Sequence, residues 1–242
     1  MQEGSLQLAL PPLPSTFQFE RTRPIRSAVY RMARLSLRRR VLDVGAGDGP
    51  VAEEIAARTG RRVFALDAER AGALREGVIR IQGDAHALPF GGGTLDAVAY
   101  HFVLLWLHGP VQALGEAARV LVPGGVVMIL SEPDMTRRVE EPETGLGSCL
   151  AKVVERAGGH PDAGSLLPGW LEEAGFRPRL RETSKDWTSV QDAREIAWEV
   201  AFLEKTGVVS PEGAAALQAR ERAAEGRRKV LLPLAYGVGV KA

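Results

Sequence analysis

Three glycines occupy alternate positions in the stretch VLDVGAGDGP, between an apolar run and a predicted helix. Gly45, Gly47 and Gly49 carry no side chain, so backbone amides there can approach a ligand closely, and positive φ costs little. A dinucleotide-binding turn would read G-x-G-x-x-G, with pyrophosphate at the helix N-terminus. Here Pro50 stands where the third dinucleotide glycine would be. The spacing therefore indicates a ligand-binding turn and leaves the ligand open.

Three carboxylates accompany this turn, within or at the ends of three successive predicted strands. Asp43 lies inside the run before the turn, a costly place for a carboxylate unless it meets a cation or hydrogen-bond donors. Asp67 ends the next run and could accept hydrogen bonds from both hydroxyls of a ribose, as also happens in NAD-binding proteins. Asp84, in GDA, could accept one from an exocyclic amine. Three carboxylates around the turn disfavour a phosphate-rich ligand and favour a cationic ligand that contains a ribose. S-adenosylmethionine fits this description.

The elements that must position these residues alternate between strands and helices. Strands are expected at 38–45, 61–67, 78–85, 94–104 and 126–133, with a turn at 123–125, and helices at 49–60, 68–77 and 110–121. Strands that alternate with helices of this length predict a parallel sheet covered on both faces. The fold class expected is α/β, doubly wound and mostly parallel.

Outside this core the chain does not keep the regular alternation of strands and helices. The expected organisation is an N-terminal arm and cap helix (1–40, with the helix from Pro24 to Leu37), a ligand-binding core (41–133), a lid insertion (134–165), a core helix and strand (166–187), a helical insertion (188–229) and a final core strand (230–242). Trp170, Trp187 and Trp198 are expected to pack in apolar cores, although Trp198 on a lid helix could contact substrate.

Five stretches carry a resemblance to a known family: VLDVGAGDGPVAEEIA, VFALDAE, IQGDAHALPF, LDAVAYHFVLLWL and EAARVLVPGGVVMILSEP. In this order, over residues 38–132, they resemble the class I S-adenosylmethionine-dependent methyltransferases, of the group that includes the ubiquinone and menaquinone biosynthesis type. The resemblance implies a seven-stranded Rossmann-like sheet whose last strand is antiparallel, and S-adenosyl-L-methionine as methyl donor, with S-adenosyl-L-homocysteine as product.

The resemblance also implies donor contacts, residue by residue. They fall on Asp43, Gly45, Ala46, Gly47, Gly49, Asp67, Ala68, Gly83, Asp84, Ala85, Tyr100, His101 and Phe102. Asp43 and the glycine turn would receive the methionine part, Asp67 the ribose, and Asp84 the adenine amine. Tyr100 and His101 would line the sulfonium side. Many relatives have a histidine where Leu105 stands, so that histidine's role does not transfer.

Among the four histidines, only His101 falls at the carboxyl end of a predicted strand. It is the candidate catalytic residue, as a general base near neutral pKa, but a polar wall or a backbone-only contact is the favoured alternative. No spacing of histidines and carboxylates matches a metal site, so no metal is predicted. Cys149 lies in a predicted helix and is expected to pack rather than to act as a nucleophile.

The stretch RTRPIRSAVYRMARLSLRRR holds eight arginines. It could grip RNA phosphates or form a solvated helix face, and the latter is favoured because aromatics are few and the formal net charge is only +1. The leading hypothesis is therefore methyl transfer to a small molecule in a lidded cleft, with nucleic acid not expected as a partner. An RNA- or protein-modifying methyltransferase, a non-catalytic adenosyl-binding protein and a nicotinamide dehydrogenase are the alternatives.

Composition bounds these hypotheses. The chain of 242 residues is 45% hydrophobic, enough for a full core, and no apolar run has the roughly 20 residues that span a bilayer. Its one cysteine allows no internal disulfide, which fits a reducing cytoplasm. Asparagine is absent and arginine far outnumbers lysine, which suits a heat-adapted protein, although a GC-rich genome would give the same arginine bias. The acceptor and the oligomeric state are left undetermined.

Overall fold

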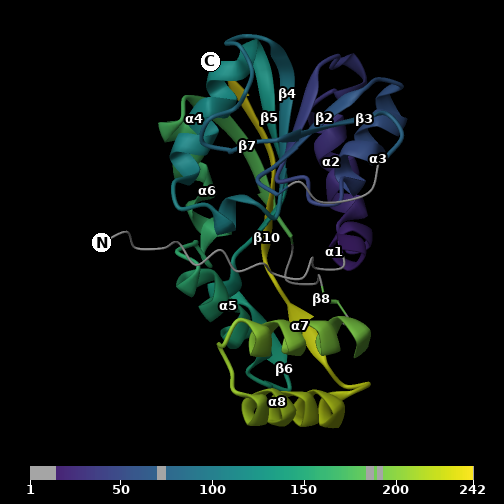
Figure 1. The fold of residues 1–242 in the computed structure, drawn as a ribbon, viewed down its shortest axis with the longest axis vertical. Coiled ribbons are helices and arrows are strands. Elements are labelled where there is room, and N and C mark those ends of the chain that lie inside the picture. The colour runs from purple at the N-terminus through teal and green to yellow at the C-terminus, as the bar shows by residue number, and fades with distance from the viewer. Residues whose placement is uncertain (1–14, 70–74, 184–187, 190–192, 242) are drawn as a thin grey trace.

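The computed structural model describes residues 15–69, 75–183, 188–189 and 193–241. Within them, seven strands form a sheet in the order β3-β2-β1-β4-β5-β10-β7 (Figure 1). These strands are β1 (Val41–Val44), β2 (Val63–Asp67), β3 (Val78–Gln82), β4 (Leu95–His101), β5 (Leu121–Pro133), β7 (Phe176–Glu182) and β10 (Leu234–Lys241). In this sheet β10 runs opposite to the other six strands, which are parallel to one another. The expected α/β fold, with one antiparallel strand, is confirmed.

Helices cover both faces of the sheet (Figure 1). One face carries α2 (Arg23–Met32) and α3 (Pro50–Thr59), and the other carries α4 (Pro110–Val120) and α6 (Ala163–Glu173). Each face has its own cluster of buried apolar side chains. All four residues of β1 are buried, as a central strand covered on both sides requires.

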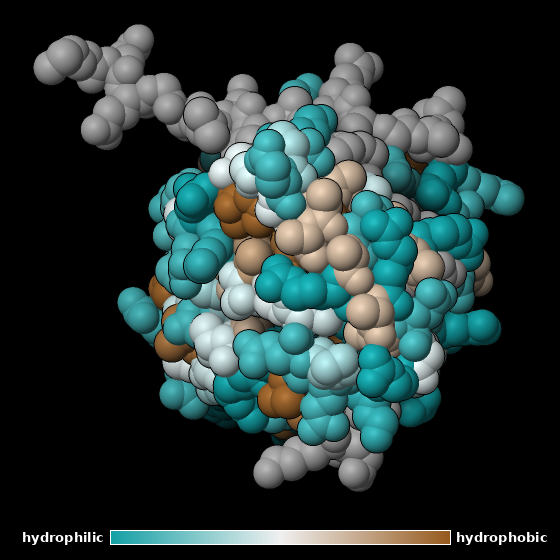
Figure 2. All heavy atoms as spheres, turned by 90° about the horizontal axis from the view of Figure 1, so that it is seen from below, coloured by the Kyte–Doolittle hydropathy of each residue, from teal (hydrophilic) through white to brown (hydrophobic). Residues whose placement is uncertain are grey.

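A separate layer, here called the lid, lies beyond one end of the sheet (Figure 1). It comprises α5 (Leu146–Arg156), α7 (Ala193–Lys205), α8 (Pro211–Ala224) and an antiparallel sheet of β6 (Val139–Glu141), β9 (Lys229–Leu231) and β8 (Thr188–Ser189). Buried residues of α5, α7 and α8 share one apolar cluster. Viewed from this end, the surface is mostly hydrophilic, with apolar side chains in small separate patches (Figure 2). The two insertions predicted separately thus fold together, through contacts distant in sequence that leave no periodic signal.

The N-terminal prediction needs two corrections. A short helix, α1 (Ser15–Arg21), occupies part of the stretch expected to be an arm. The helix expected to run from Pro24 to Leu37 ends at Met32, because Arg34 adopts a left-handed φ of 50° that a continuing helix does not allow. A single 3-10 turn, η1 (Leu35–Leu37), follows it.

The predicted closing strand is also divided. Its first residues form β9 in the lid, and β10 begins only at Leu234. Pro233 separates them because proline has no N–H for a sheet hydrogen bond. The turn expected at 123–125 is a bulge inside β5: Leu121 pairs with Leu95, and Val126 with Ala97. Of the helix expected at 68–77, residues 70–74 lie outside the described residues, and residues 68–69 and 75–77 are not helical. Of the helices described, none has the length and apolar character to cross a membrane.

Candidate functional site

The glycine turn connects β1 to α3 with an unusual backbone. Gly45, Gly47 and Gly49 have φ values of 66°, 49° and 80°. The Gly49 amide closes the turn by donating to the Ala46 carbonyl at 2.7 Å. A Cβ on Gly45 would lie only 2.5 Å from a methyl of Val103, in the loop after β4. Both the backbone angle and the close packing therefore require glycine at position 45.

Hydrogen bonds tie the turn to the ends of β2 and β3. The Asp67 carboxylate accepts one from the Gly47 amide at 2.7 Å, and the Asp67 carbonyl accepts one from the Gly83 amide at 2.9 Å. Asp84 follows directly, with 66% of its side chain exposed. Its carboxylate accepts from the His86 amide at 2.8 Å, and this bond holds its pKa below the usual value. The predicted meeting of these strand ends is observed.

Two alanines flank these carboxylates. Ala68 is exposed beside Asp67, whereas Ala85 beside Asp84 is buried, with 8% exposed. The Ala85 side chain belongs to the apolar cluster on the α4 side of the sheet.

Asp43 is a buried carboxylate with one unsatisfied oxygen. The residue is 1% exposed, and its Oδ2 has no hydrogen-bond partner. Burial raises the pKa of Asp43 to about 8; the nearby Asp67 carboxylate adds to the rise, whereas the Ala52 amide and the Arg26 guanidinium oppose it. Such an oxygen is costly to leave unpaired, and a cation placed beside it would remove that cost.

Arg26 on α2 is a further residue of the site, one that the motif pattern does not single out. It is fully buried, with Nε on Glu54 at 2.7 Å, Nη1 on Thr22 at 2.9 Å, and its guanidinium 3.7 Å from the centre of the Phe19 ring. Nη2 has no hydrogen-bond partner. The available signal was position, because Arg26 lies three and four residues before Val29 and Tyr30, on the apolar side of the helix. This arginine is thus not part of a solvated face.

The Arg26 charge also acts on His101, at the end of β4. His101 Nε2 lies 2.9 Å from the Thr22 hydroxyl, which donates its own proton to the Gln18 carbonyl at 2.6 Å. Nε2 is therefore assigned as the donor in its contact with Thr22. Burial, with Arg26, lowers the pKa of His101 to about 3. His101 is consequently neutral at pH 7, in contrast to the near-neutral pKa expected from the sequence.

The residues on either side of His101 differ in orientation. Tyr100 is fully buried, and its hydroxyl donates to the Ala113 carbonyl at 3.2 Å on the α4 side of the sheet. Contrary to the expectation, its side chain faces the core, and only its backbone remains for a ligand. Phe102 adopts a φ of 57° and packs edge-on against His101, with ring centres 4.9 Å apart. It is partly exposed and lines two cavities.

Glu132, near the end of β5, fixes the loop that follows β4. It is fully buried, and its carboxylate accepts from the amides of Val103 and Leu104 at 2.9 and 3.0 Å and from Leu105 at 3.3 Å. Burial raises the pKa of Glu132 to about 7, and the three amides oppose the rise. Because Val103 packs on Gly45, Glu132 indirectly holds the glycine turn in place.

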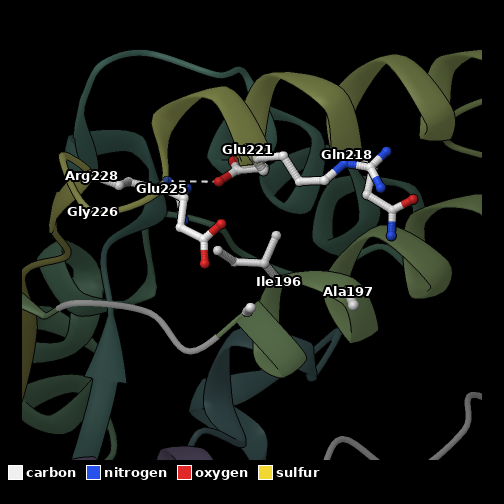
Figure 3. Close-up of a pocket in the computed structure, with 9 residues that line it drawn as sticks. Ile196, Ala197, Gln218, Glu221, Glu225, Gly226 and Arg228 are labelled. Atoms are coloured by element: carbon white, nitrogen blue, oxygen red, sulfur yellow. Dashed lines mark ion pairs between the residues drawn. The ribbon is translucent and has the colours of Figure 1, made fainter.

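The lid contains a further, separate cavity of about 470 Å³ between α7 and α8 (Figure 3). Ile196 and Ala197 line one side, and the ion pair between Glu221 and Arg228, 3.0 Å long, lies on the other. No residue from the strand ends lines it. Cys149 packs against the same lid cluster, as expected for a structural cysteine. Within the described ranges, no three His, Cys, Asp or Glu side chains are grouped as metal ligands.

Comparison with known proteins agrees with this geometry. Residues 42–129 match a family model described as a methyltransferase domain. A demethylmenaquinone methyltransferase of Thermobifida fusca is 31% identical over 166 residues, which cover 62% of this chain and 69% of that protein. This match extends well beyond the region of the five motifs.

Solved structures of low sequence identity share the fold. A candidate methyltransferase from Bacillus halodurans aligns with a TM-score of 0.62 at 19% identity, over 89% of this chain and 98% of that one. A Haemonchus contortus N-methyltransferase, solved with phosphomonomethylethanolamine and S-adenosylhomocysteine, aligns with a TM-score of 0.57 at 16% identity, over 93% of this chain and 57% of that one. Taken with the sequence relatives, these findings show that the chain belongs to the class I S-adenosylmethionine-dependent methyltransferases.

Proposed function

We propose that the protein transfers a methyl group from S-adenosylmethionine to a small molecule, and that Asp43 and Arg26 hold the amino-acid end of the donor. That end is a zwitterion, which needs one anion and one cation. Asp43 Oδ2 and Arg26 Nη2 are both buried without a hydrogen-bond partner, and the Arg26 charge lowers the Asp43 pKa. Asp43 would meet the ammonium and Arg26 the carboxylate. This pair of unsatisfied, opposite groups is the observation that carries the proposal.

The ribose and adenine of the donor would bind at the exposed edge of the site, at Asp67 and Asp84. Asp67 would accept hydrogen bonds from the ribose hydroxyls, since a carboxylate keeps lone pairs beyond those used by Gly47 and Glu69. Asp84 is largely exposed and would accept from the adenine amine, with Gly83 and Ala85 as backbone neighbours. Backbone approach at Gly45, Ala46, Gly47 and Gly49 would complete the contacts.

The chemistry asks little of the side chains. S-adenosylmethionine, when bound, supplies a methyl already activated by its sulfonium. The residues around it need to align an acceptor atom with that methyl, about 3 Å away, and keep water out. With its low pKa and its Nε2 bonded to Thr22, His101 suits a neutral wall beside Phe102 rather than the general base expected from the sequence.

A small-molecule acceptor is supported by two observations. The relative from Thermobifida fusca is named for a small molecule, demethylmenaquinone. In addition, the cavities that Phe102 lines are bounded partly by lid residues and measure about 110 and 60 Å³, too little for a polymer. An arginine-rich grip on RNA receives less support, because Arg26 of that stretch is fully buried.

Calorimetric titration of the full chain with S-adenosylmethionine, S-adenosylhomocysteine and NAD tests the donor site. Both adenosyl compounds should bind, and NAD should give no saturable heat. A response to NAD alone, or to none of the three, would overturn the proposed site.

A further inference from the structure

Two cavities meet between the sheet and the lid. The larger is lined from α1, α5, α7 and the loops after β4 and β5, and the smaller from α1, α7 and the segment before β10. They share five residues: Gln18, Phe102, Arg138, Glu199 and Leu232. We treat them as one space, called here the acceptor chamber. Because Thr22 and Phe102 contact it, the chamber adjoins His101 and the sulfonium side of the donor site.

Aromatic side chains form much of the chamber wall. Phe102, Trp106, Trp198 and Phe202 are four of the thirteen residues that line the larger cavity, although aromatics make up only 6% of the chain. Trp198 and Phe202 stack with ring centres 5.0 Å apart and planes 16° from parallel. Walls of this kind favour a flat, apolar ring, which gains from both burial and aromatic contact.

The charges that face the chamber cancel. Glu195 and Glu199 come from α7, Arg21 from α1, and Arg138 from the segment before β6. These four formal charges sum to zero; Glu195 is paired with Arg21, and Arg138 is paired with Glu140, which does not line the chamber. A charged acceptor would enter a space with no net counter-charge and would lose its hydration there. The balance therefore favours an uncharged acceptor.

Glu199 lies where its carboxylate can contact the nucleophilic group of that acceptor. It is 9% exposed, lines both cavities, and follows Trp198 on α7, so a ring against Trp198 would bring its substituent near this carboxylate. We propose that the chamber binds the methyl acceptor, an uncharged flat ring whose nucleophilic group carries a hydrogen, and that Glu199 accepts a hydrogen bond from that group. This inference rests on the proposed function, since it assigns the acceptor side of the same reaction.

Three single-ring probes of one size separate the contributions: p-cresol, toluene and p-toluate. Their dissociation constants are measured by ligand-observed NMR titration of the full chain saturated with S-adenosylhomocysteine. The wild type should bind p-cresol more tightly than toluene and should reject the p-toluate anion. Glu199→Met should weaken p-cresol binding roughly tenfold, the value of one hydrogen bond to a charged group. Toluene binding should not change.

Glu204→Met is the matched control, because Glu204 is exposed on the same helix. It should leave all three probes unaffected. S-adenosylhomocysteine binding, measured on each variant, shows that the fold is intact and reports the donor site independently. Equal p-cresol affinity in wild type and Glu199→Met, absence of any ring binding, or p-toluate binding as tight as p-cresol would each overturn the inference. If the wild type binds the ring probes but not S-adenosylhomocysteine, the result would instead contradict the proposed donor site.

Discussion

The Oδ2 of Asp67 accepts a hydrogen bond from the Gly47 amide at 2.7 Å, so the carboxyl end of β2 is fastened to the glycine turn after β1. A residue proposed to hold the ribose thus also shapes the turn proposed to hold the methionine part. The two halves of the donor site are therefore mechanically linked. Substitutions in one half should be felt in the other.

Asp67→Ala should weaken S-adenosylhomocysteine binding by about 10- to 100-fold, since it removes acceptors for two ribose hydroxyls and frees the Gly47 amide. Isothermal calorimetry measures this loss. Glu173→Ala, at an exposed position on α6, is the control and should bind as the wild type does. Unaltered affinity in Asp67→Ala would show that the ribose contact is wrongly assigned.

Asp43 should make stability depend on pH when no donor is bound. Its pKa of about 8 in the folded protein lies above the ordinary value of 3.8, so the folded state holds a proton that the unfolded state has lost. The stabilisation that comes from this bound proton is fully present below pH ~4 and is lost as pH rises to about 8. Over that range the free energy of unfolding should fall by up to about 1.4 kcal/mol per pH unit. When the free energy of unfolding is measured with urea across this pH range, it should fall with pH more steeply in the wild type than in Asp43→Asn.

The same pKa predicts proton release when the donor binds. A cation beside Asp43 favours its ionised form, so binding S-adenosylmethionine at pH 7 should release close to one proton. Calorimetry in buffers of different ionisation enthalpy measures that number. Asp43→Asn should abolish the release, and an identical release from the variant would contradict the role given to Asp43.

The effect of the Arg26 charge should be detectable in the pKa of His101. The Arg26 charge helps to lower the pKa of His101, so Arg26→Met should raise that pKa. NMR titration of the imidazole measures it. Donor affinity should fall as well, because the cation for the donor carboxylate is gone. Arg23→Met, exposed on the same helix, should change neither quantity.

Two glycines of the turn should respond differently to alanine. At Gly47, nothing lies within 4 Å of the added Cβ, so only the backbone angle is penalised, by about 1–2 kcal/mol. At Gly45 the Cβ would also meet Val103 at 2.5 Å, which should cost a further 1–3 kcal/mol or so. Denaturant unfolding compares the variants. Val103→Ala combined with Gly45→Ala should recover part of the difference, and equal costs at both glycines would refute the packing argument.

The sequence by itself determined the core of the fold and the rim of the site. Alternating strands and helices have distinct hydrophobic periods, and each period is a local property of the chain. For the same reason Asp43, Asp67, Asp84 and the glycine turn could be placed at strand ends, because parallel strands bring their carboxyl ends to one edge. The structure agrees in the order of the strands and in the hydrogen bonds that join these ends.

Only the tertiary structure decided what packs around that edge. Arg26 looks like one arginine among eight in its stretch until α2 docks and buries it. Tyr100 and His101 are neighbours on one strand, yet alternate side chains face opposite sides, which sends Tyr100 into the core. The lid draws α5, α7 and α8 together from distant segments. Such contacts depend on burial and charge between residues far apart in the chain, and no local pattern records them.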